Sequence, residues 1–262
     1  MKKVKHKIAV ISGKGGVGKS TVTVNLAAAF AQHSHLNNVG ILDADIHGPS
    51  VPRLLGLTGK QVKFGPPGAF PIIGPLNMKV VSIDFFLAEE QTPTIWRGPL
   101  KMTAIRQLLQ DIVWGELDVL FIDLPPGTGD EPLSVAQLLP EIDGVIVVTM
   151  PSELSSAIVK KAITFARRLG MPIIGIVENL SSYICPHCGE KVDIFQHGGG
   201  RRMAQDTDVP FLGSIPIDPK IGKEADKGIP FVTIDKESPA TKAFMEIVEK
   251  VELYLSKKEQ SK

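Results

Sequence analysis

One stretch near the N-terminus decides the fold, and it reads Ile8-Ala9-Val10-Ile11-Ser12-Gly13-Lys14-Gly15-Gly16-Val17-Gly18-Lys19-Ser20-Thr21. The four apolar residues at its start predict a buried strand, and the segment from Ser20 to Gln32 predicts a helix. The glycine-rich residues between them have the spacing G-x-x-x-x-G-K-[ST], which is typical of a phosphate-binding loop between a strand and a helix. This stretch therefore predicts an α/β domain with a phosphate site at the end of its first strand.

The loop has the chemistry of a nucleoside triphosphate site. Glycines allow backbone amides to turn toward phosphates, and the helix N-terminus favours negative charge. Lys19 is expected to reach the β- and γ-phosphates, and the Ser20 hydroxyl is expected to bind Mg²⁺. A glycine-rich turn that only joins strand to helix is the alternative. The predicted ligands are ATP and Mg²⁺, and the predicted contacts are Gly13, Lys14, Gly15, Gly16, Val17, Gly18, Lys19, Ser20 and Thr21.

Further short β-rich runs follow along the chain, and most are apolar on both faces. Such runs are typical of buried parallel strands, and helical patterns lie between several of them. We therefore predict a mostly parallel twisted sheet flanked by helices, in a single domain over residues 1–262. The runs are 39–42, 80–83, 119–122, 145–148, 173–177 and 211–215.

Other segments carry local predictions. Helices are expected over Met102 to Gln110 and Ser155 to Leu169, and an irregular surface loop over the Gly- and Pro-dense Phe64 to Pro75. Apolar residues at helical spacing predict a C-terminal helix near 239–255, followed by a frayed tail. Glutamates on the polar face of that helix favour packing on the domain over binding to a membrane surface.

Composition limits the classes of partner. Lys and Arg number 29 against 28 Asp and Glu, so the net charge of +1 gives no reason to expect nucleic acid or a membrane. No export signal and no spanning segment are visible in the sequence. Only two cysteines occur, Cys185 and Cys188, which fits a reducing cytoplasm and a ligand or redox role for the pair.

Acidic residues follow two of the predicted strands. Asp123 comes at the end of an apolar run, where an acid that holds Mg²⁺ and senses the γ-phosphate belongs. Asp43 and Asp45 end another strand, and either is a candidate to orient the attacking water or to hold the magnesium shell. A turn acid is the alternative for Asp123, and a helix cap or turn acid for Asp45. With Lys14 and Lys19, Asp43 and Asp45 form the predicted catalytic set.

The cysteine pair sits in the stretch Cys185-Pro186-His187-Cys188. Two thiolates cannot complete a four-sulfur shell, so a metal needs two more ligands, which a two-fold symmetric dimer supplies. His187 is expected to face solvent. A shared [4Fe-4S] cluster and a bridging zinc ion are equally compatible with the spacing. A dithiol redox motif is disfavoured because no helical run follows, and fortuitous surface thiols are a further alternative.

The motif Lys14 to Thr21 resembles the deviant Walker A of the nucleotide-switch ATPases that include MinD, ParA and the nitrogenase iron protein. Further motifs make the chain similar to the Mrp family of iron-sulfur cluster carrier ATPases, over nearly the whole chain. These motifs are Asp43-Ala44-Asp45-Ile46-His47-Gly48-Pro49-Ser50, Trp96-Arg97-Gly98-Pro99, Trp114-Gly115-Glu116-Leu117-Asp118, Asp123-Leu124-Pro125-Pro126-Gly127-Thr128-Gly129-Asp130, Glu178-Asn179 and Cys185 to Cys188.

The resemblance implies a homodimer that binds and slowly hydrolyses ATP, holds a labile cluster between subunits and passes it to apoproteins. It implies that Lys14 reaches the nucleotide of the partner subunit, and that Glu153 touches it too. It assigns adenine recognition to Asn179, Pro216 and Asp218. A solvated surface lysine is the alternative for Lys14.

Two other functions share the same ATPase core. A spatial organiser of the MinD or ParA kind would need a membrane helix or a DNA-binding surface, and neither is evident. A zinc-bridged, nucleotide-dependent scaffold would hold metal without transferring a cluster. Liposome and DNA binding, and metal analysis of anaerobically purified protein, separate these functions from a carrier.

Overall fold

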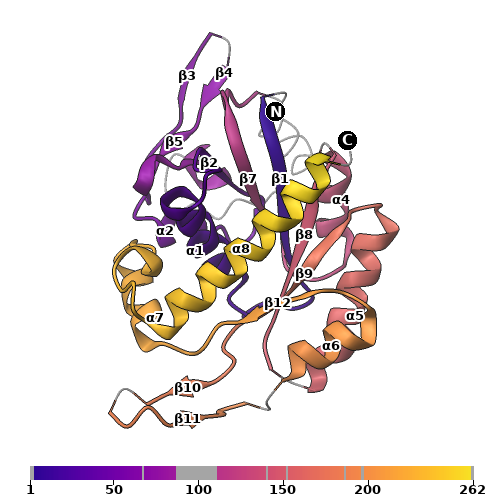
Figure 1. Cartoon of the computed structure of the whole chain (residues 1–262). Helices are drawn as coiled ribbons and strands as arrows, with labels where there is room; N and C mark the ends of the chain where they lie inside the picture. Colours follow the sequence, from indigo (N-terminus) through magenta and orange to yellow (C-terminus); the bar gives the residue numbers. More distant parts are fainter. Residues whose placement is uncertain are drawn as a thin grey trace.

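An eight-stranded sheet is the centre of the structure, a computed structural model that describes residues 3–66, 68–86, 111–139, 141–151, 153–185, 187–195 and 198–260 (Figure 1). The side chains of residues 131 and 153–156 are outside that description. Neighbouring strands are parallel, except that the edge strand β5 runs antiparallel to β6. Their spatial order is β12 (Phe211–Ser214), β9 (Ile173–Glu178), β8 (Gly144–Thr149), β1 (Val4–Ser12), β7 (Leu117–Asp123), β2 (Val39–Asp43), β6 (Lys79–Ser82) and β5 (Ile72–Ile73).

Helices cover the sheet, as predicted. The long helix α8 crosses the front of the sheet in Figure 1 and packs against α1, while α5 packs against α6 and against β8 and β9. The helix bounds are α1 Lys19–His33, α2 Val51–Leu54, α4 Asp130–Leu138, α5 Glu153–Arg168, α6 Gly199–Thr207, α7 Pro219–Asp226 and α8 Pro239–Gln260. Short 3-10 turns cover Pro75–Asn77, Ile83–Phe86 and Phe231–Thr233.

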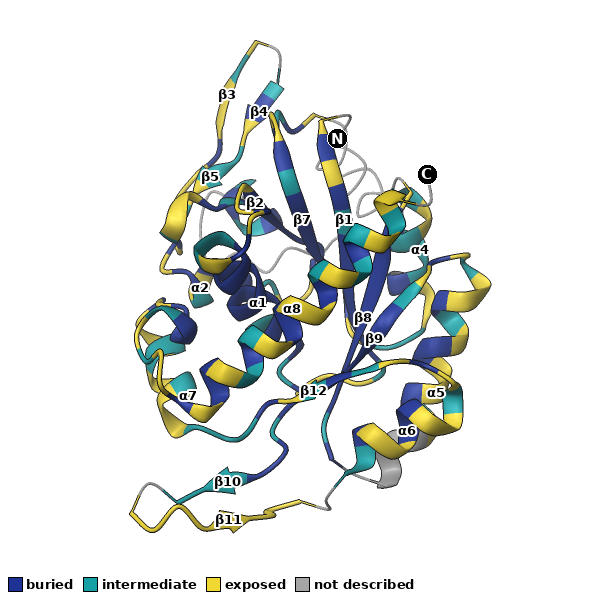
Figure 2. Cartoon of the chain, viewed as in Figure 1, coloured by how far each residue is buried: buried dark blue, intermediate teal, exposed yellow. Residues whose placement is uncertain are grey.

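The core lies on both faces of the central strands. Every residue of β2 and of β8 is buried, as Figure 2 shows by the dark strands at the centre. The rings of Phe30 and Phe121 join α1 to β7 edge-on, with centroids 5.4 Å apart. The prediction of buried parallel strands that are apolar on both faces is confirmed.

The sheet order brings the ends of three strands together. β1 lies between β7 and β8, and β2 lies on the far side of β7. Asp43 and Asp123 occupy directly neighbouring register positions on β2 and β7, and Val10 of β1 is paired with Asp123. The loop after β1 therefore opens beside both acids, at the edge where parallel α/β sheets bind ligands.

The prediction of an irregular loop over Phe64 to Pro75 is wrong. This segment contains β3 (Lys63–Gly65) and β4 (Gly68–Phe70), an antiparallel pair, and the edge strand β5. The Ala69 amide donates to the Asp111 carbonyl at 2.9 Å, and the Val113 amide donates to the Ala69 carbonyl at 2.8 Å. Backbone pairing with a distant segment thus orders a stretch whose composition favours turns.

The predicted fraying after residue 255 is also wrong, because α8 continues to Gln260. His6 Nε2 lies 2.9 Å from Glu259 Oε1, and Lys258 Nζ lies 3.0 Å from the buried Asp143 carboxylate. These contacts bring the end of α8 beside the start of β1, where both ends of the described chain meet in Figure 1. Tertiary contacts extend a helix that the local sequence alone would end.

Two predicted features fall outside the described residues: the helix over Met102 to Gln110 and the motif Trp96-Arg97-Gly98-Pro99. Helices α6 and α7 were not predicted from the sequence. Helix α6 begins in the glycine run 198–200, with Gly198 in the left-handed conformation at its N-cap. The cysteine stretch also has more order than a loop, because β10 (Tyr183–Ile184) and β11 (Lys191–Val192) form a hairpin around it.

Candidate functional site

The loop between β1 and α1 encloses a hollow of about 250 Å³ at the carboxyl edge of the sheet. Two segments that follow other strands complete its wall: Asp45 and Ser50 come from the chain after β2, and Pro126 comes from the chain after β7. The other lining residues are Ser12, Gly15, Gly16, Gly18, Lys19, Ser20, Thr21 and Leu54. The structure thus brings most of the predicted phosphate loop into one concave site.

Two glycines of the loop are required by close contacts. A Cβ at Gly13 would lie 2.6 Å from the backbone carbonyl oxygen of Ile158 in α5, so only glycine fits there. Gly18 has a φ of +78°, and a Cβ there would lie 2.3 Å from the Asn179 amide nitrogen. Ile158 and Asn179 therefore pack closely against one side of the loop. The other side lines the hollow and is open to a ligand.

The two residues that open α1 converge on Asp123. Lys19 Nζ lies 2.6 Å from Asp123 Oδ2, and both side chains are nearly inaccessible to solvent. The Ser20 hydroxyl donates to the same oxygen at 2.5 Å. Thr23, which the sequence reasoning missed, donates to Asp123 Oδ1 at 2.6 Å. The sequence does contain a signal for Thr23: it lies one helical turn after Lys19, so both side chains are on the same face of α1.

Asp43 lies beside this cluster, and its charge is suppressed. Its carboxylate accepts hydrogen bonds from the backbone amides of Asp45 and Val51, each at 3.2 Å. Burial, followed by repulsion from Asp123, raises the pKa of Asp43 to about 8. A predominantly protonated Asp43 next to an ion-paired Asp123 is the arrangement that lets two carboxyl groups share a buried edge.

The segments that follow β2 and β7 border the hollow on two sides. The Gly48 amide donates to Asp45 Oδ1 at 3.1 Å, so Asp45 makes the turn contact considered as its alternative role while also lining the hollow. On the other side, the Gly127 amide donates to the Ser12 carbonyl at 2.9 Å. Both segments therefore border the hollow in which the phosphates are expected to bind.

Lys14 and Glu153 are the residues predicted to act on the partner subunit's nucleotide. Lys14 is exposed, and within the described part of the chain it makes no ion pair. Glu153 is the first residue of α5, but its side chain lies outside the described set. An exposed lysine at the mouth of the loop is available to a second subunit, and its role stays a prediction.

Asn179 follows β9 and holds the phosphate loop in place. Its side-chain amide donates to the Val17 carbonyl at 2.9 Å, and its backbone amide donates to the Thr149 carbonyl at 2.8 Å. The side chain is buried against Gly18. This clamp was not predicted from the sequence, which assigned Asn179 only to the base.

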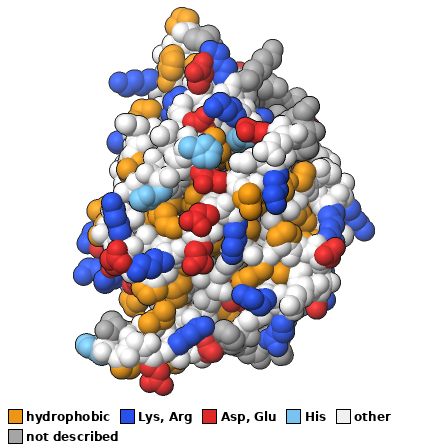
Figure 3. Space-filling view, in the orientation of Figure 1, with side chains coloured by type: hydrophobic (Ala, Val, Ile, Leu, Met, Phe, Trp, Pro, Cys, Tyr) orange, Lys and Arg blue, Asp and Glu red, His pale blue; other side chains and the backbone are white. Residues whose placement is uncertain are grey.

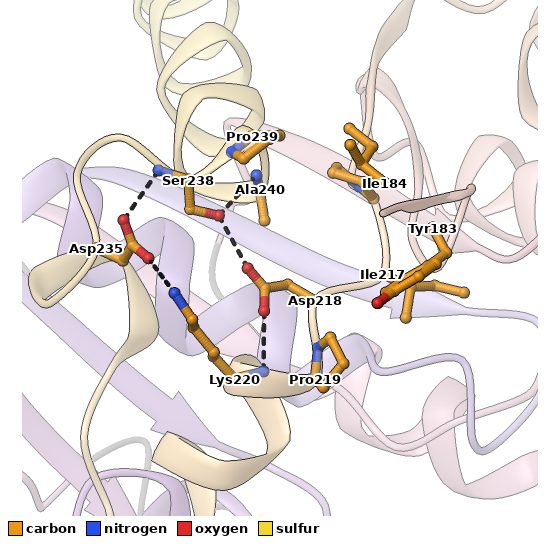
Figure 4. A pocket seen from close by; sticks show the side chains of 11 residues that line it. Tyr183, Ile184, Ile217, Asp218, Pro219, Lys220, Asp235, Ser238, Pro239 and Ala240 are labelled. Atoms are coloured by element: carbon orange, nitrogen blue, oxygen red, sulfur yellow. Dashed lines mark hydrogen bonds and ion pairs between the residues drawn. The ribbon is translucent and has the colours of Figure 1, made fainter. Parts of the chain in front are cut away.

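Pro216 and Asp218 line a separate cavity of about 380 Å³, shown in Figure 4. Asp218 caps α7: it accepts from the Lys220 amide at 2.9 Å and from the Ser238 hydroxyl at 3.0 Å. Tyr183 and Ile184 of β10 form another wall of the same cavity. The structure does not place these two residues in the hollow of the phosphate loop, and their role toward adenine stays a prediction.

The cysteine hairpin, formed by β10, β11 and the residues between them, stands apart from the main sheet (Figure 1). Cys188 is exposed and Cys185 partly so, and His187 is exposed as predicted. The Gly189 amide donates to the Cys185 carbonyl at 2.9 Å, which closes a tight turn. Hydrogen bonds from the Cys188 and His187 amides lower the pKa of the Cys185 thiol, which increases the share of thiolate, the form that binds metal.

A short backbone path joins the hairpin to the phosphate loop. After Asn179, the Ser181 amide donates to the Ile215 carbonyl at 3.0 Å, and the Ile217 amide donates to the Ser182 carbonyl at 2.7 Å. The hairpin begins at the next residue, Tyr183. The segment that positions the thiols is thus the continuation of the segment that clamps the nucleotide loop.

The described residues include no helix that is long and apolar enough to cross a membrane. They also include no group of three or more His, Cys, Asp or Glu side chains arranged to hold a metal ion. Within the described chain, the cysteine pair therefore lacks the further ligands that a four-ligand site requires.

A phosphate loop after the first strand of a parallel sheet, with acids at the ends of the neighbouring strands, defines a P-loop nucleotide-binding protein. The family model described as ParA, NUBPL iron-transfer P-loop NTPase, matches residues 3–252. The chain belongs to that family.

Close relatives agree with the resemblance to cluster carriers. The iron-sulfur cluster carrier protein of Methanocaldococcus jannaschii is 54% identical over 254 residues, 96% of this chain and 87% of the relative. That of Saccharolobus solfataricus is 51% identical over 251 residues, 96% of this chain and 84% of the relative. The predicted membership of the iron-sulfur cluster carrier family is confirmed.

Solved structures agree with the fold. A nucleotide-binding protein of Archaeoglobus fulgidus, in complex with ADP, has a TM-score of 0.77 and 43% identity, covering 87% of this chain and 88% of its own. MinD of Pyrococcus horikoshii, complexed with Mg-ADP, has a TM-score of 0.68 over 94% of this chain and 96% of its own, but only 23% identity. The MinD likeness supports the fold alone.

The buried carboxyl pair predicts opposite effects on stability and activity. Replacing Asp43 with Asn removes the repulsion from Asp123 and keeps an oxygen for the backbone amides. Because the folded-state pKa is raised from 3.8 to about 8, the wild-type acid loses stability as the pH rises through that range. Asp43→Asn should therefore raise the free energy of unfolding near pH 8 by on the order of 1 kcal/mol, while slowing ATP hydrolysis about 10²-fold.

Chemical denaturation at several pH values and steady-state phosphate release measure the two effects. Asp45→Asn is the matched control, because Asp45 is only partly buried and its neutralisation should bring no comparable gain in stability. A destabilised or fully active Asp43→Asn protein would contradict this account of the site.

Proposed function

We propose that this protein is an ATP-binding and ATP-hydrolysing carrier that holds an iron-sulfur cluster between two copies of the chain and transfers it to apoproteins. One observation carries the proposal: Cys188, which is exposed, and Cys185, which is partly exposed, stand on a hairpin that continues the segment clamping the phosphate loop. The relatives named iron-sulfur cluster carrier proteins support the same function.

The cation of the site is held in position before any ligand binds, because Lys19 is paired with Asp123. ATP entering the hollow would draw Lys19 from Asp123 toward the β- and γ-phosphates, where the lysine stabilises developing charge. Ser20, Asp123 and Asp43 present the oxygen donors that Mg²⁺ prefers, so they are the residues expected to hold it. When bound there, Mg²⁺ neutralises charge on the phosphate oxygens.

Hydrolysis needs a positioned water more than a strong base. Asp45 lines the hollow, and Asp43 lies beneath it beside Asp123, so these two acids are the candidates to orient the water. Lys14 would add a second cation from the partner subunit. Adenine recognition is assigned to Asn179, Pro216 and Asp218, and Glu153 is assigned to the partner's nucleotide.

The cluster is the cargo, and its ligands come from both chains. Two thiolates from each hairpin complete the shell of a [4Fe-4S] cluster on the two-fold axis of a homodimer. A zinc ion in the same four-sulfur shell is the chemical alternative. Exposure of the thiols suits a labile cargo, because an acceptor's cysteines can reach it.

Anaerobic reconstitution with iron and sulfide tests this function. We expect one [4Fe-4S] cluster per dimer, measured by iron, sulfide and protein content together with the native mass, and transfer of the cluster to an apoprotein. Cys185→Ala should abolish cluster uptake but leave ATP binding intact, because the thiol lies outside the phosphate hollow. Uptake by a monomer, or by the cysteine variant, would refute the shared cluster.

Replacing either of the two lysines of the loop should impair the protein in a different way. Lys19→Ala should weaken ATP binding by about tenfold or more, because it removes a buried cation that is expected to reach the phosphates. Lys14→Ala should leave ATP binding by the isolated chain unchanged but abolish ATP-dependent dimerisation and hydrolysis. Nucleotide titration, sedimentation and phosphate release distinguish the two outcomes, and equal loss of binding in both variants would argue against a role for Lys14 in the partner site.

Nucleotide state and cluster affinity are coupled in this proposal through Asn179. Removing its bond to Val17 disconnects the phosphate loop from the segment that leads to the hairpin. Asn179→Ala should therefore reduce the difference in cluster-release rate among the apo, ADP and ATP-analogue forms.

Ser214→Ala is the control for this coupling, because it removes a bond to Glu178 at a neighbouring strand end without touching the loop. Release to an acceptor, followed by absorbance, should still depend on nucleotide in this control. Equal release rates in all nucleotide states of the parent protein would refute the coupling itself.

A further inference from the structure

A groove of about 540 Å³ lies between the start of α4 and the second half of α5. Both helices lie on the right-hand side of the sheet in Figure 1. The groove shares no described lining residue with the hollow of the phosphate loop. Its α5 wall is one face of the helix, because Lys161, Phe165 and Arg168 follow one another at intervals of four and three residues. The function proposed above makes no use of this groove.

The rim of the groove is basic. Lys161 and Arg168 are exposed, and among the described side chains neither forms an ion pair. Lys160, which also lines the groove, is paired with Asp206 at 3.1 Å. Asp130 is the acid among the described lining residues. Acidic and basic side chains are interspersed over the face of the molecule in Figure 3, so the excess of positive charge in the groove is a local feature.

The floor of the groove is apolar. Phe165 and Leu169 pack against the core but stay partly exposed, and Leu133 of α4 is half-buried opposite them. Phe165 lies between the two unpaired cations along α5. A ligand that matches this surface carries two negative charges with an apolar group between them.

We infer that the groove between α4 and α5 binds an acidic segment of a partner protein. Carboxylates of that segment pair with Lys161 and Arg168, and an apolar side chain between them covers Phe165. Seven residues of helix separate the two cations by about 10 Å, which equals the spacing of two carboxylates two turns apart on a helical segment. The inference goes beyond the proposed function, because it involves neither the thiols nor a cluster.

An acidic protein segment fits the groove better than the other anionic partners. Nucleic acids and anionic membranes are held by several phosphate-contacting cations, whereas the described groove offers two unpaired ones. The recessed apolar floor also suits a side chain of a protein segment. Charge and shape therefore favour the same kind of partner.

Both walls of the groove are connected to the nucleotide site. The groove begins at Thr128, and the amide of the preceding Gly127 donates to the Ser12 carbonyl at 2.9 Å. On the other wall, Ile158 of α5 leaves room only for glycine at Gly13, one residue further along the phosphate loop. A partner in the groove would contact the two elements that border this loop, so its affinity should depend on bound nucleotide.

Defined probes added to the full chain without iron test the inference. The main probe is a fluorescent peptide of about 20 residues, designed as a helix with two glutamates two turns apart and leucines between them. A matched peptide has glutamines in place of the glutamates. A single-stranded oligonucleotide and vesicles of phosphatidylserine and phosphatidylcholine represent the other anionic partners.

Charge reversal identifies the residues that bind the peptide. Lys161→Glu and Arg168→Glu remove the two cations, singly and together. Lys223→Glu on α7 is the matched control, because this lysine is exposed and lies outside the groove. Binding is followed by fluorescence anisotropy, and the vesicles are tested by co-sedimentation.

We expect the acidic peptide to bind with a dissociation constant on the order of 100 µM or lower. The glutamine peptide and each single reversal should weaken binding about fivefold, while the Lys223 control should match the parent. The double variant should instead bind a peptide with lysines in place of the glutamates, which a misfolded protein would not do.

Three results would overturn the inference: no saturable binding of the acidic peptide below about 1 mM, parental binding by both single variants, or reversals that impair only oligonucleotide or vesicle binding.

The link to the nucleotide has its own measurement. Peptide affinity should differ about threefold or more between the nucleotide-free and ATP-analogue forms, and saturating peptide should change nucleotide affinity by the same factor. Equal peptide affinity in every nucleotide state would refute the link. None of these assays requires metal or the cysteines, so a failure of the groove leaves the cluster carrier standing, and a failure of cluster uptake leaves the groove standing.

Discussion

The buried ion pair between Lys19 and Asp123 is the interaction on which the rest of the site depends. A lone charge in this position would be costly, and the hydroxyls of Ser20 and Thr23 complete the hydrogen bonding of the carboxylate. The pair ties the first turn of α1 to the end of β7 in the centre of the sheet. Because the same lysine is expected to bind phosphate, ligand binding must exchange one ionic partner for another. If Lys19 binds phosphate as proposed, nucleotide binding acts directly on the end of β7.

The sequence predicted what local pattern and strand order control. The loop of Gly13 to Thr21, the parallel strands and the acids at their ends follow from motif spacing and from runs of apolar residues. Their convergence follows as well, since parallel strands end at the same edge of a sheet. What it missed depends on contacts between distant segments. The pairing of Ala69 with residues 111 and 113, and the contact of Glu259 with His6, have no signature in the local sequence.

The same distinction applies within the site. Its residue type and place after a strand identified Asp43 as a functional candidate, and the family resemblance identified Asn179, but neither gave their physical state. The raised pKa of Asp43 arises from burial and from the neighbouring register position of Asp123, which requires the three-dimensional structure. The Asn179 clamp likewise needs β9 beside the phosphate loop. For these two residues the sequence predicted a place near the nucleotide site. Their protonation state and hydrogen bonds depend on how the folded chain packs around them.

The two functional parts of the molecule also differ in how firmly they are held. The phosphate loop lies at the end of a strand with neighbours on both sides and is backed by α5 and Asn179. The cysteines lie on a hairpin whose strands have two residues each, and such a hairpin has little stability of its own. In the proposed dimer, metal and a second hairpin would supply the contacts that the single hairpin lacks. In the proposed carrier, the firmly held part binds the nucleotide and the weakly held part is the one expected to change when the cluster is released.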